Sequence, residues 1–397
     1  MKNLPYSDTT NMLYKGKVVK GMDFNKPAVF PYFPTTSFTM NSLSEVKSSY
    51  QNNYTYIRNN NPNRDALADV VTFLEKGERS LIFSSGMGAI TTTLLTLLKP
   101  GDEILCNSNI YGETYQVLAS LLPKFGVNTV FVDFCDLKNA RKAISPATKL
   151  VYSEVCTNPT LCIADVPELA NIAHTNGALL MIDNTFTTAI AIKPITLGAD
   201  IVINSLTKFM NGHSDALGGS ITASADIIDQ ISPVRMIVGT SGDPYASFTM
   251  LKNFATMDLR VNKQMQNAYR LATALEAHQH ISRINHPGLE SYPQHALAMR
   301  LFHSAESISG MMSIIVPENE QKIDEFMQRL EFAHYAVTLG GVHTTMLHPV
   351  TSSHRLMPDE KRRAMGITPG MIRISVGIEN VDDLIADFSQ ALGAFDA

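Results

Sequence analysis

Short apolar runs alternate with segments of helical spacing over residues 80–204, and this alternation limits the fold more than any other feature. The predicted strands are 81–83, 103–106, 129–134, 149–155, 178–182 and 201–204, and predicted helices follow the first two, one ending at 98 and one over about 114–122. Buried strands that are separated by helices pair in parallel through right-handed crossovers. The pattern therefore predicts an α/β domain with a mostly parallel central sheet and helices on both faces.

The length of 397 residues exceeds that of one ordinary domain, so we expect the chain to be divided. Residues 1–62 are rich in Asn, Tyr, Pro and Thr with little periodicity, and are interpreted as an extended N-terminal arm. Residues 63–250 are predicted to form the large α/β domain. Residues 251–397 are predicted to form a smaller C-terminal α+β domain. A long helical stretch at about 245–280 precedes predicted strands at 312–316 and 371–376, and a final helix has Asn380 as its N-cap.

Composition excludes several classes of function. The net charge of −5 comes without a basic tract, which makes nucleic acid and anionic membranes poor partners. We see no apolar run of about 18 residues, as a membrane span requires, and no secretion signal at the N-terminus. His343, His348 and His354 lack a metal-ligand spacing, so no metal is expected. These features predict a soluble, cytoplasmic protein that is large enough to be an enzyme.

Polar residues follow three of the predicted strands, where ligands of open α/β sheets bind. Ser84-Ser85-Gly86-Met87-Gly88 leads into a helix and could hold a phosphate, or could be only a tight turn. Asp183 could cap a helix or hold a cation. Lys208 could be a snorkelling surface lysine, or a desolvated nucleophile that forms a Schiff base.

Each of these three features has a plainer interpretation when taken alone. Taken together, they fit one cofactor. The glycine turn would hold the phosphate of pyridoxal 5'-phosphate (PLP), Asp183 would keep its ring nitrogen protonated, and Lys208 would bind its aldehyde. A nicotinamide or a metal would not use all three. The sequence therefore predicts a PLP site.

Longer motifs around these residues resemble the Cys/Met-metabolism PLP-dependent enzymes, a family that includes cystathionine γ-synthase, cystathionine lyases, methionine γ-lyase and the homoserine sulfhydrylases. The resemblance rests on Asp183-Asn184-Thr185-Phe186, Ser205-Leu206-Thr207-Lys208 with Asn211-Gly212-His213-Ser214-Asp215, and Ser84-Ser85-Gly86-Met87. It runs from about Tyr56 to the last helix and implies the fold of PLP-dependent transferases (fold type I). It also implies a homo-oligomer, usually a tetramer.

The resemblance assigns a role to each matching residue. The arm motif of Tyr56 and Arg58 would hold the cofactor phosphate of the neighbouring subunit. The backbones of Gly86 and Met87 and the hydroxyls of Ser205 and Thr207 would also bind the phosphate. Tyr111 would stack on the ring and act as an acid or base, and Asn158 would contact the ring hydroxyl. Arg373 would bind the substrate carboxylate. Lys208, Tyr111 and Asp183 are the candidate catalytic residues.

The chain departs from the family pattern mainly on the substrate side. Glu113 stands where Gly or Cys is common, and His343 where Glu is usual. Thr338 replaces a Ser, Cys156 replaces a Pro, and the usual Ser-Pro-x-Asp pattern is lost at 239–248. Glu113 and His343 change the charge of the expected substrate pocket, so they leave the PLP chemistry intact and the substrate open.

Four functions remain open from the sequence. The main hypothesis is a carbon–sulfur lyase that eliminates a thiol or hydrogen sulfide from cystathionine, methionine or cysteine, leaving a 2-oxo acid and ammonia. The alternatives are a γ-replacement transferase, of the cystathionine γ-synthase or homoserine sulfhydrylase type, and a specialised enzyme for an unusual γ-substituted amino acid. A binding protein on an inactive PLP fold is disfavoured by the intact set of Lys208, Asp183, Tyr111 and Arg373.

Overall fold

The computed structural model describes residues 7–15, 28–52 and 54–396. The chain divides into two compact units. Unit 1 comprises Met1–Leu98 and Asp200–Asp258, and unit 2 comprises Lys99–Ala199 and Leu259–Ala397. The predicted arm at 1–62 lies partly outside the described residues, and the predicted domain boundaries after 62 and 250 stay a prediction.

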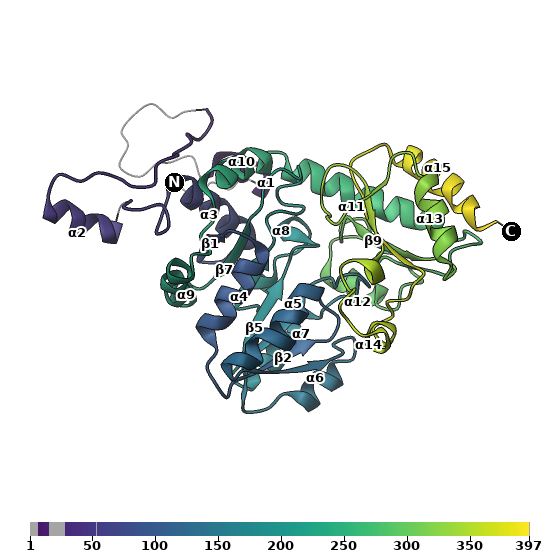
Figure 1. Cartoon of the computed structure of the whole chain (residues 1–397), viewed down its shortest axis with the longest axis horizontal. Coiled ribbons are helices and arrows are strands. Elements are labelled where there is room, and N and C mark those ends of the chain that lie inside the picture. The colour runs from purple at the N-terminus through teal and green to yellow at the C-terminus, as the bar shows by residue number, and fades with distance from the viewer. Residues whose placement is uncertain (1–6, 16–27, 53, 397) are drawn as a thin grey trace. The chain divides into compact units, whose positions relative to one another are not determined.

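Unit 1 is built around three strands in the order β1-β7-β6, in which β7 runs antiparallel to both neighbours. Helices α3, α4 and α9 all lie against β1 or β7, as the left part of Figure 1 shows. The elements of this unit are α1 (Asp8–Tyr14), α2 (Leu43–Asn52), α3 (Pro62–Glu75), β1 (Arg79–Phe83), α4 (Gly86–Leu97), β6 (Ile201–Asn204), β7 (Gly219–Ala223), α9 (Ala225–Val238) and α10 (Pro244–Phe254). Helix α3 begins where the side chain of Asn61 caps it and Pro62 fixes its first turn.

Unit 2 contains two groups of strands. The first group runs parallel throughout in the order β5-β4-β2-β3. Its elements are β2 (Glu103–Asn107), α5 (Gly112–Gln116), β3 (Asn128–Val132), α6 (Leu137–Ala143), β4 (Thr148–Glu154), α7 (Val166–Thr175), β5 (Leu179–Asp183) and α8 (Thr188–Ala191). The carboxyl ends of these parallel strands therefore share one edge.

The second group is a sheet in the order β10-β11-β12-β9-β8, antiparallel except between β10 and β11. Its elements are α11 (Met257–Leu275), β8 (Arg283–Asn285), α12 (His295–Leu301), β9 (Met311–Ile315), α13 (Glu320–Arg329), β10 (His334–Tyr335), β11 (Thr345–Leu347), α14 (Asp359–Ala364), β12 (Met371–Ser375) and α15 (Val381–Leu392). One buried core joins this sheet to α11, α13 and α15. Asn380 caps α15 by accepting from the backbone of Asp382, as predicted.

The predicted α/β class with a mostly parallel sheet and an additional α+β part is confirmed, with local corrections. Each predicted strand lies within two residues of an observed one. The long helix expected at about 245–280 is two helices, because Thr256 donates from its backbone and its hydroxyl to the carbonyl of Asn253 and ends α10. Strand β7 was not predicted.

Candidate active site

The candidate residues fall in both units. In unit 1, Lys208 lies in a tight turn after the buried strand β6. The backbone of Lys208 donates to the carbonyl of Ser205 at 3.2 Å, and Gly212 donates to the carbonyl of Lys208 at 2.8 Å. The Thr207 hydroxyl both donates to and accepts from the backbone of Gly218, at 3.1 and 3.0 Å. The turn is therefore fixed from both sides, which holds Lys208 in a half-buried position.

The N-terminus of α4 packs directly on this turn. A side chain at Gly86 would come within 3.0 Å of the Cβ of Ser205, so only glycine lets the two backbones approach this closely. The Ser85 side chain caps the helix by accepting from the backbone of Gly88 at 2.9 Å. The first N–H groups of α4 and the Ser205 hydroxyl thus lie together at a positive helix end, where a phosphate fits.

Tyr56 and Arg58 are exposed in unit 1. Tyr56 pairs with Ser37, and the Arg58 guanidinium lies 5.8 Å from the centre of the Tyr56 ring. Arg58 lines a broad hollow of about 1320 Å³ that also contains Arg235. Gly86, Met87, Ser205 and Lys208 are not among the residues that line this hollow.

In unit 2, two carboxylates end neighbouring parallel strands. Glu154 ends β4 and Asp183 ends β5, and the two residues pair in the sheet register. Burial raises the pKa of both side chains, and the negative charge of Asp183 raises that of Glu154 further. The backbone of Thr185 donates to Asp183 at 2.9 Å and partly opposes the shift. A buried carboxylate pair of this kind fits a cationic ring nitrogen, which would lower the repulsion between them.

Glu154 also holds two other candidate residues in place. Its carboxylate accepts from the backbone of Tyr111 at 2.7 Å and from the backbone of Asn158 at 2.9 Å. No role was predicted for Glu154 from the sequence, although it follows a buried strand just as Asp183 does. The carboxyl ends of β4 and β5 therefore position Tyr111, Asn158 and Asp183 around one carboxylate.

Arg373 on β12 is buried and joins the same group. Its guanidinium donates to the side-chain oxygen of Asn158 at 3.2 Å and to the carbonyl of Thr338 at 3.0 Å. Burial lowers its pKa to about 10, so it carries a full charge at neutral pH. Its buried Nε contacts no acceptor within the described part of the chain. A buried charged donor of this kind suits a substrate carboxylate.

Tyr111 contacts the residue that departs from the family pattern. The Tyr111 hydroxyl donates to the exposed carboxylate of Glu113. Burial first, and then the charge of Glu113, raise the pKa of Tyr111, while the charge of Arg373 opposes the shift. Glu113 thus acts directly on the group predicted to transfer protons.

The other departures lie at different places. His343 is exposed in the loop before β11, where Glu379 accepts from the backbone and hydroxyl of the next residue, Thr344, at 2.5 and 2.9 Å. Thr338 is half-buried and meets Arg373 through its carbonyl rather than its side chain. Cys156 is buried with the raised pKa of a thiol that packs as a small apolar group.

His354 is a further residue of this region for which no role was predicted from the sequence. It is buried, and its pKa is lowered to about 4 by burial first and in part by the charges of Arg373 and Arg362. The ring is therefore neutral at pH 7. The backbone of the preceding Ser353 leaves no room for a side chain at Gly112, whose Cβ would come within 2.1 Å of the Ser353 carbonyl oxygen. The segment around His354 thus fixes the start of α5, next to Tyr111.

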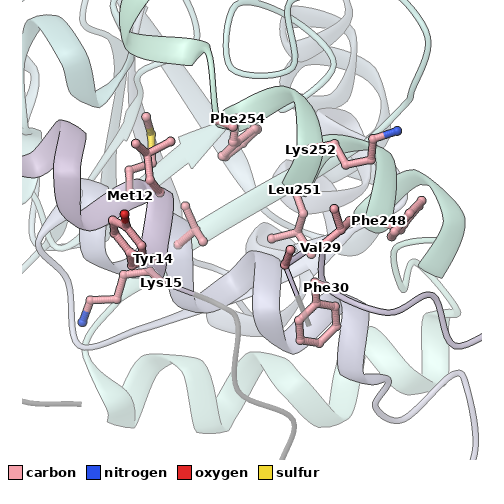
Figure 2. A pocket seen from close by; sticks show the side chains of 13 residues that line it. Met12, Tyr14, Lys15, Val29, Phe30, Phe248, Leu251, Lys252 and Phe254 are labelled. Atoms are coloured by element: carbon pink, nitrogen blue, oxygen red, sulfur yellow. The ribbon is translucent and has the colours of Figure 1, made fainter. Parts of the chain in front are cut away.

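A second pocket lies within unit 1. Figure 2 shows side chains from α1, from residues 28–30, from α3 and from α10 around a cavity of about 330 Å³. The lining is mostly apolar, with Lys15 and Lys252 at its border. No predicted site residue lines it, so we assign it no part in the chemistry.

Neither a metal centre nor a membrane-spanning helix occurs in the described part of the chain. Within 7–15, 28–52 and 54–396, no group of three or more His, Cys, Asp or Glu side chains could hold a metal ion. No helix in the same residues has the length and apolarity needed to cross a lipid bilayer.

The two-unit α/β architecture and the strand-end residues define a class that comparison with solved structures makes specific. Cystathionine γ-synthase from Xanthomonas oryzae pv. oryzae, in complex with aminoacrylate and cysteine, matches with a TM-score of 0.93 and 31% sequence identity, over 98% of this chain and 99% of that chain. The fold is thus that of the fold type I PLP-dependent enzymes.

Sequence comparison then identifies the family. A family model described as "Cys/Met metabolism PLP-dependent enzyme" matches residues 10–393. Cystathionine γ-lyase from Bacillus subtilis (strain 168) is 38% identical over 356 residues, which cover 89% of this chain and 93% of the relative. L-methionine γ-lyase from Fusobacterium nucleatum subsp. polymorphum is 34% identical over 368 residues, with 91% and 92% covered. This chain belongs to the Cys/Met-metabolism PLP-dependent enzymes, which confirms the predicted family and cofactor.

Proposed function

We propose that this chain is a carbon–sulfur lyase that eliminates a thiol or hydrogen sulfide from a sulfur amino acid, leaving a 2-oxo acid and ammonia. The observation that carries the proposal is the connected group in unit 2, in which Arg373, Asn158, Glu154 and Tyr111 are joined by hydrogen bonds. This group contains a buried arginine, Arg373, that can bind the carboxylate of an amino acid, and a tyrosine, Tyr111, whose hydroxyl can transfer protons. The lyase names of the Bacillus and Fusobacterium relatives favour elimination.

Each residue has a defined part in this reaction. PLP, when bound, supplies an electron sink that stabilises the negative charge left by removal of the α-proton. Lys208 holds the cofactor and then moves protons at the α-carbon, and at the β-carbon when the leaving group lies on Cγ. Asp183 holds a proton at the ring nitrogen, and Arg373 orients the substrate through its carboxylate. The Tyr111 hydroxyl gives a proton to the departing sulfur.

The remaining predicted contacts belong to the same proposal. The backbones of Gly86 and Met87 and the hydroxyls of Ser205 and Thr207 hold the phosphate, and Asn158 contacts the ring hydroxyl. Thr338, Glu113 and His343 face the substrate. The close packing of Gly86 on Ser205 supports the phosphate site.

The lyase proposal is tested by measuring the formation of 2-oxo acid, with cysteine, methionine and cystathionine as separate substrates. Formation of 2-oxo acid from at least one of them is expected. A second candidate is γ-replacement, which is favoured by the close match to the Xanthomonas γ-synthase structure. Condensation of cysteine with an O-acyl homoserine, without release of 2-oxo acid, would replace the lyase proposal with that transferase. Failure of both assays would favour an unusual γ-substituted amino acid as the substrate. The reason to consider such a substrate is that Glu113 and His343 change the charge of the expected substrate pocket.

The active unit is proposed to be a homo-oligomer, of the tetrameric kind usual in the family, acting in the cytoplasm on small amino acids. The exposure of Tyr56 and Arg58, and the position of Arg58 in a hollow separate from the phosphate-binding turn, support an arm that serves a neighbouring subunit. Sedimentation of the PLP-loaded protein tests this. A fully active, PLP-saturated monomer would rule out the shared site.

A further inference from the structure

The exposed motif of Tyr56 and Arg58 lies on a short turn of unit 1 that other side chains hold in shape. The carbonyl of Tyr56 accepts from the backbone of Asn59 at 2.9 Å, which closes the turn. The next three carbonyls, of Ile57, Arg58 and Asn59, each accept a hydrogen bond from a side chain that lies elsewhere in the chain. The main chain around Arg58 is therefore fixed, while the Arg58 side chain is exposed.

Two arginines and one serine supply these hydrogen bonds. Arg64 on α3 donates to the first of the three carbonyls, the Ser241 hydroxyl donates to the second at 2.7 Å, and Arg235 on α9 donates to the third at 3.0 Å. Ser241 and Arg235 lie 183 and 176 positions along the chain from the residues that they contact, so the fold brings them to the turn. We call Arg64, Arg235 and Ser241 the arm clamp.

The arm clamp also joins the turn to strand β1, which leads into the glycine turn at 84–88. The guanidinium of Arg235 donates a second hydrogen bond, to the carbonyl of Ile82 on β1 at 3.0 Å. The guanidinium of Arg64 donates a second hydrogen bond to the carbonyl of Gly242 at 3.0 Å, and the backbone of Gly242 donates to the carbonyl of Ile82 at 3.3 Å. Each guanidinium therefore spans two carbonyls and connects the exposed turn to a part of the chain that is fixed on the sheet.

The two arginines are a costly way to stabilise a fold. Both are buried. Burial first, and then the charge of Arg235, lower the pKa of Arg64 to about 10, and burial lowers that of Arg235 to about 10, so both are charged at neutral pH. In the described part of the chain their hydrogen bonds end on main-chain carbonyls, and both Nε atoms are buried without an acceptor. Burial of two charges in this way costs free energy, so we look for their benefit in the shape of the turn.

We propose that the arm clamp of Arg64, Arg235 and Ser241 positions the arm motif for binding the cofactor phosphate. The clamp residues do not bind the phosphate themselves. They hold the main chain of the turn in one shape before the cofactor arrives, so that binding costs less ordering of the turn. The inference rests on the proposed role of Tyr56 and Arg58, which is to hold the phosphate of the neighbouring subunit.

The test compares two ligands that differ only in the phosphate. The full chain, freed of cofactor, is titrated with PLP and separately with pyridoxal, which lacks the phosphate, and binding is followed by visible absorbance. Arg235→Lys keeps the charge but loses the fork that spans two carbonyls. Ser241→Ala removes one hydroxyl from a half-buried side chain, so it decides the question if Arg235→Lys does not fold or does not keep its subunit assembly in sedimentation.

A loss confined to PLP is the expected result. The affinity for PLP should fall about 10-fold or more in Arg235→Lys and about 3-fold in Ser241→Ala, as the loss of a charged and of a neutral hydrogen bond would give. The affinity for pyridoxal should not change. Arg79→Lys is the matched control, because Arg79 lines the same hollow and binds Asp229 of α9 at 2.6 Å, and it should bind both ligands as the unchanged protein does. An equal loss for both ligands, or no loss for PLP, would overturn the proposal.

A double-mutant cycle separates the arm clamp from the proposed role of the arm motif. Arg58→Ala should itself lower the affinity for PLP, and Ser241→Ala should cost less in that background than alone, because the group that it positions is gone. An undiminished cost in the double variant would overturn the clamp alone. An unchanged affinity in Arg58→Ala would overturn the proposed phosphate role of the motif, and the clamp with it. The readout is binding, so a failed lyase assay would leave either result standing.

Discussion

Replacing Glu113 with Gln should lower the pKa of Tyr111, because the change removes a negative charge that disfavours the phenolate. Gln keeps an oxygen that accepts the hydrogen bond from the Tyr111 hydroxyl, so the position of the ring is preserved. Unit charges about 4 Å apart interact by about 4 kcal/mol at an effective dielectric constant near 20, and by about 1 kcal/mol in water. Glu113 is exposed, so the lower figure applies, and it corresponds to a fall of about one pKa unit.

The pH dependence of kcat/KM measures this change, with the substrate that gives most 2-oxo acid. The limb of the profile that reports Tyr111 should move to lower pH by about one unit in Glu113→Gln. Glu306→Gln is the matched control, since it also removes an exposed carboxylate in the same unit and should leave that limb in place. A limb that stays fixed in Glu113→Gln, or moves to higher pH, would refute the contact between Glu113 and Tyr111 as the cause.

Three further predictions follow from the site. Lys208→Ala should keep the circular dichroism spectrum and lose turnover by about 10³-fold or more, as expected when the group that moves the protons is removed; substantial remaining turnover would refute its role. Arg373→Lys should raise KM for the amino acid about 10- to 100-fold, since Lys lacks the fork that holds Asn158 and Thr338 and each charged hydrogen bond is worth about 1.5–3 kcal/mol; an unchanged KM would contradict it. The pKa of Asp183 is raised to about 6 and that of Glu154 to about 8. Their contribution to the stability of the PLP-free protein should therefore be complete below about pH 4 and fall as pH rises through these values, by about 1.4 kcal/mol for each pH unit that separates the folded from the unfolded pKa of a group. Urea unfolding of Asp183→Asn with Glu154→Gln should lack this fall, and an equal slope in the two proteins would show that the pair does not titrate in this range.

The fold could be predicted where hydrophobic periodicity was strong. The parallel strands β2 to β5 are short apolar runs between helices, and each was found within two residues. Strand β7 was missed because its sequence is Gly-Ser-Ile-Thr-Ala, with Ser220 and Thr222 buried by contacts that a sequence does not reveal. The Thr222 hydroxyl, for example, shares a hydrogen bond of 2.7 Å with Ser80, which is 142 positions away.

The candidate site could be predicted only in part. The rule that ligands bind beyond the ends of strands predicted Asp183 and Lys208. Glu154 also stands at the end of a buried strand, so the same rule could have predicted it. Nothing in the sequence pointed to His354, because it lies in an irregular segment and its burial depends on packing against the start of α5.

The paired carboxyl groups at the ends of β4 and β5 should couple the binding of the cofactor to the release of protons. A cation that comes to lie beside Asp183 stabilises the ionised forms of Asp183 and Glu154, so cofactor uptake should expel protons into the solvent. By linkage, affinity for the cofactor should then rise with pH across the range in which the pair is still partly protonated in the empty protein. Calorimetric titration in buffers of different ionisation enthalpy would count those protons. The folded protein without cofactor would thus carry protons on Asp183 and Glu154, and the binding of its own cofactor would release them.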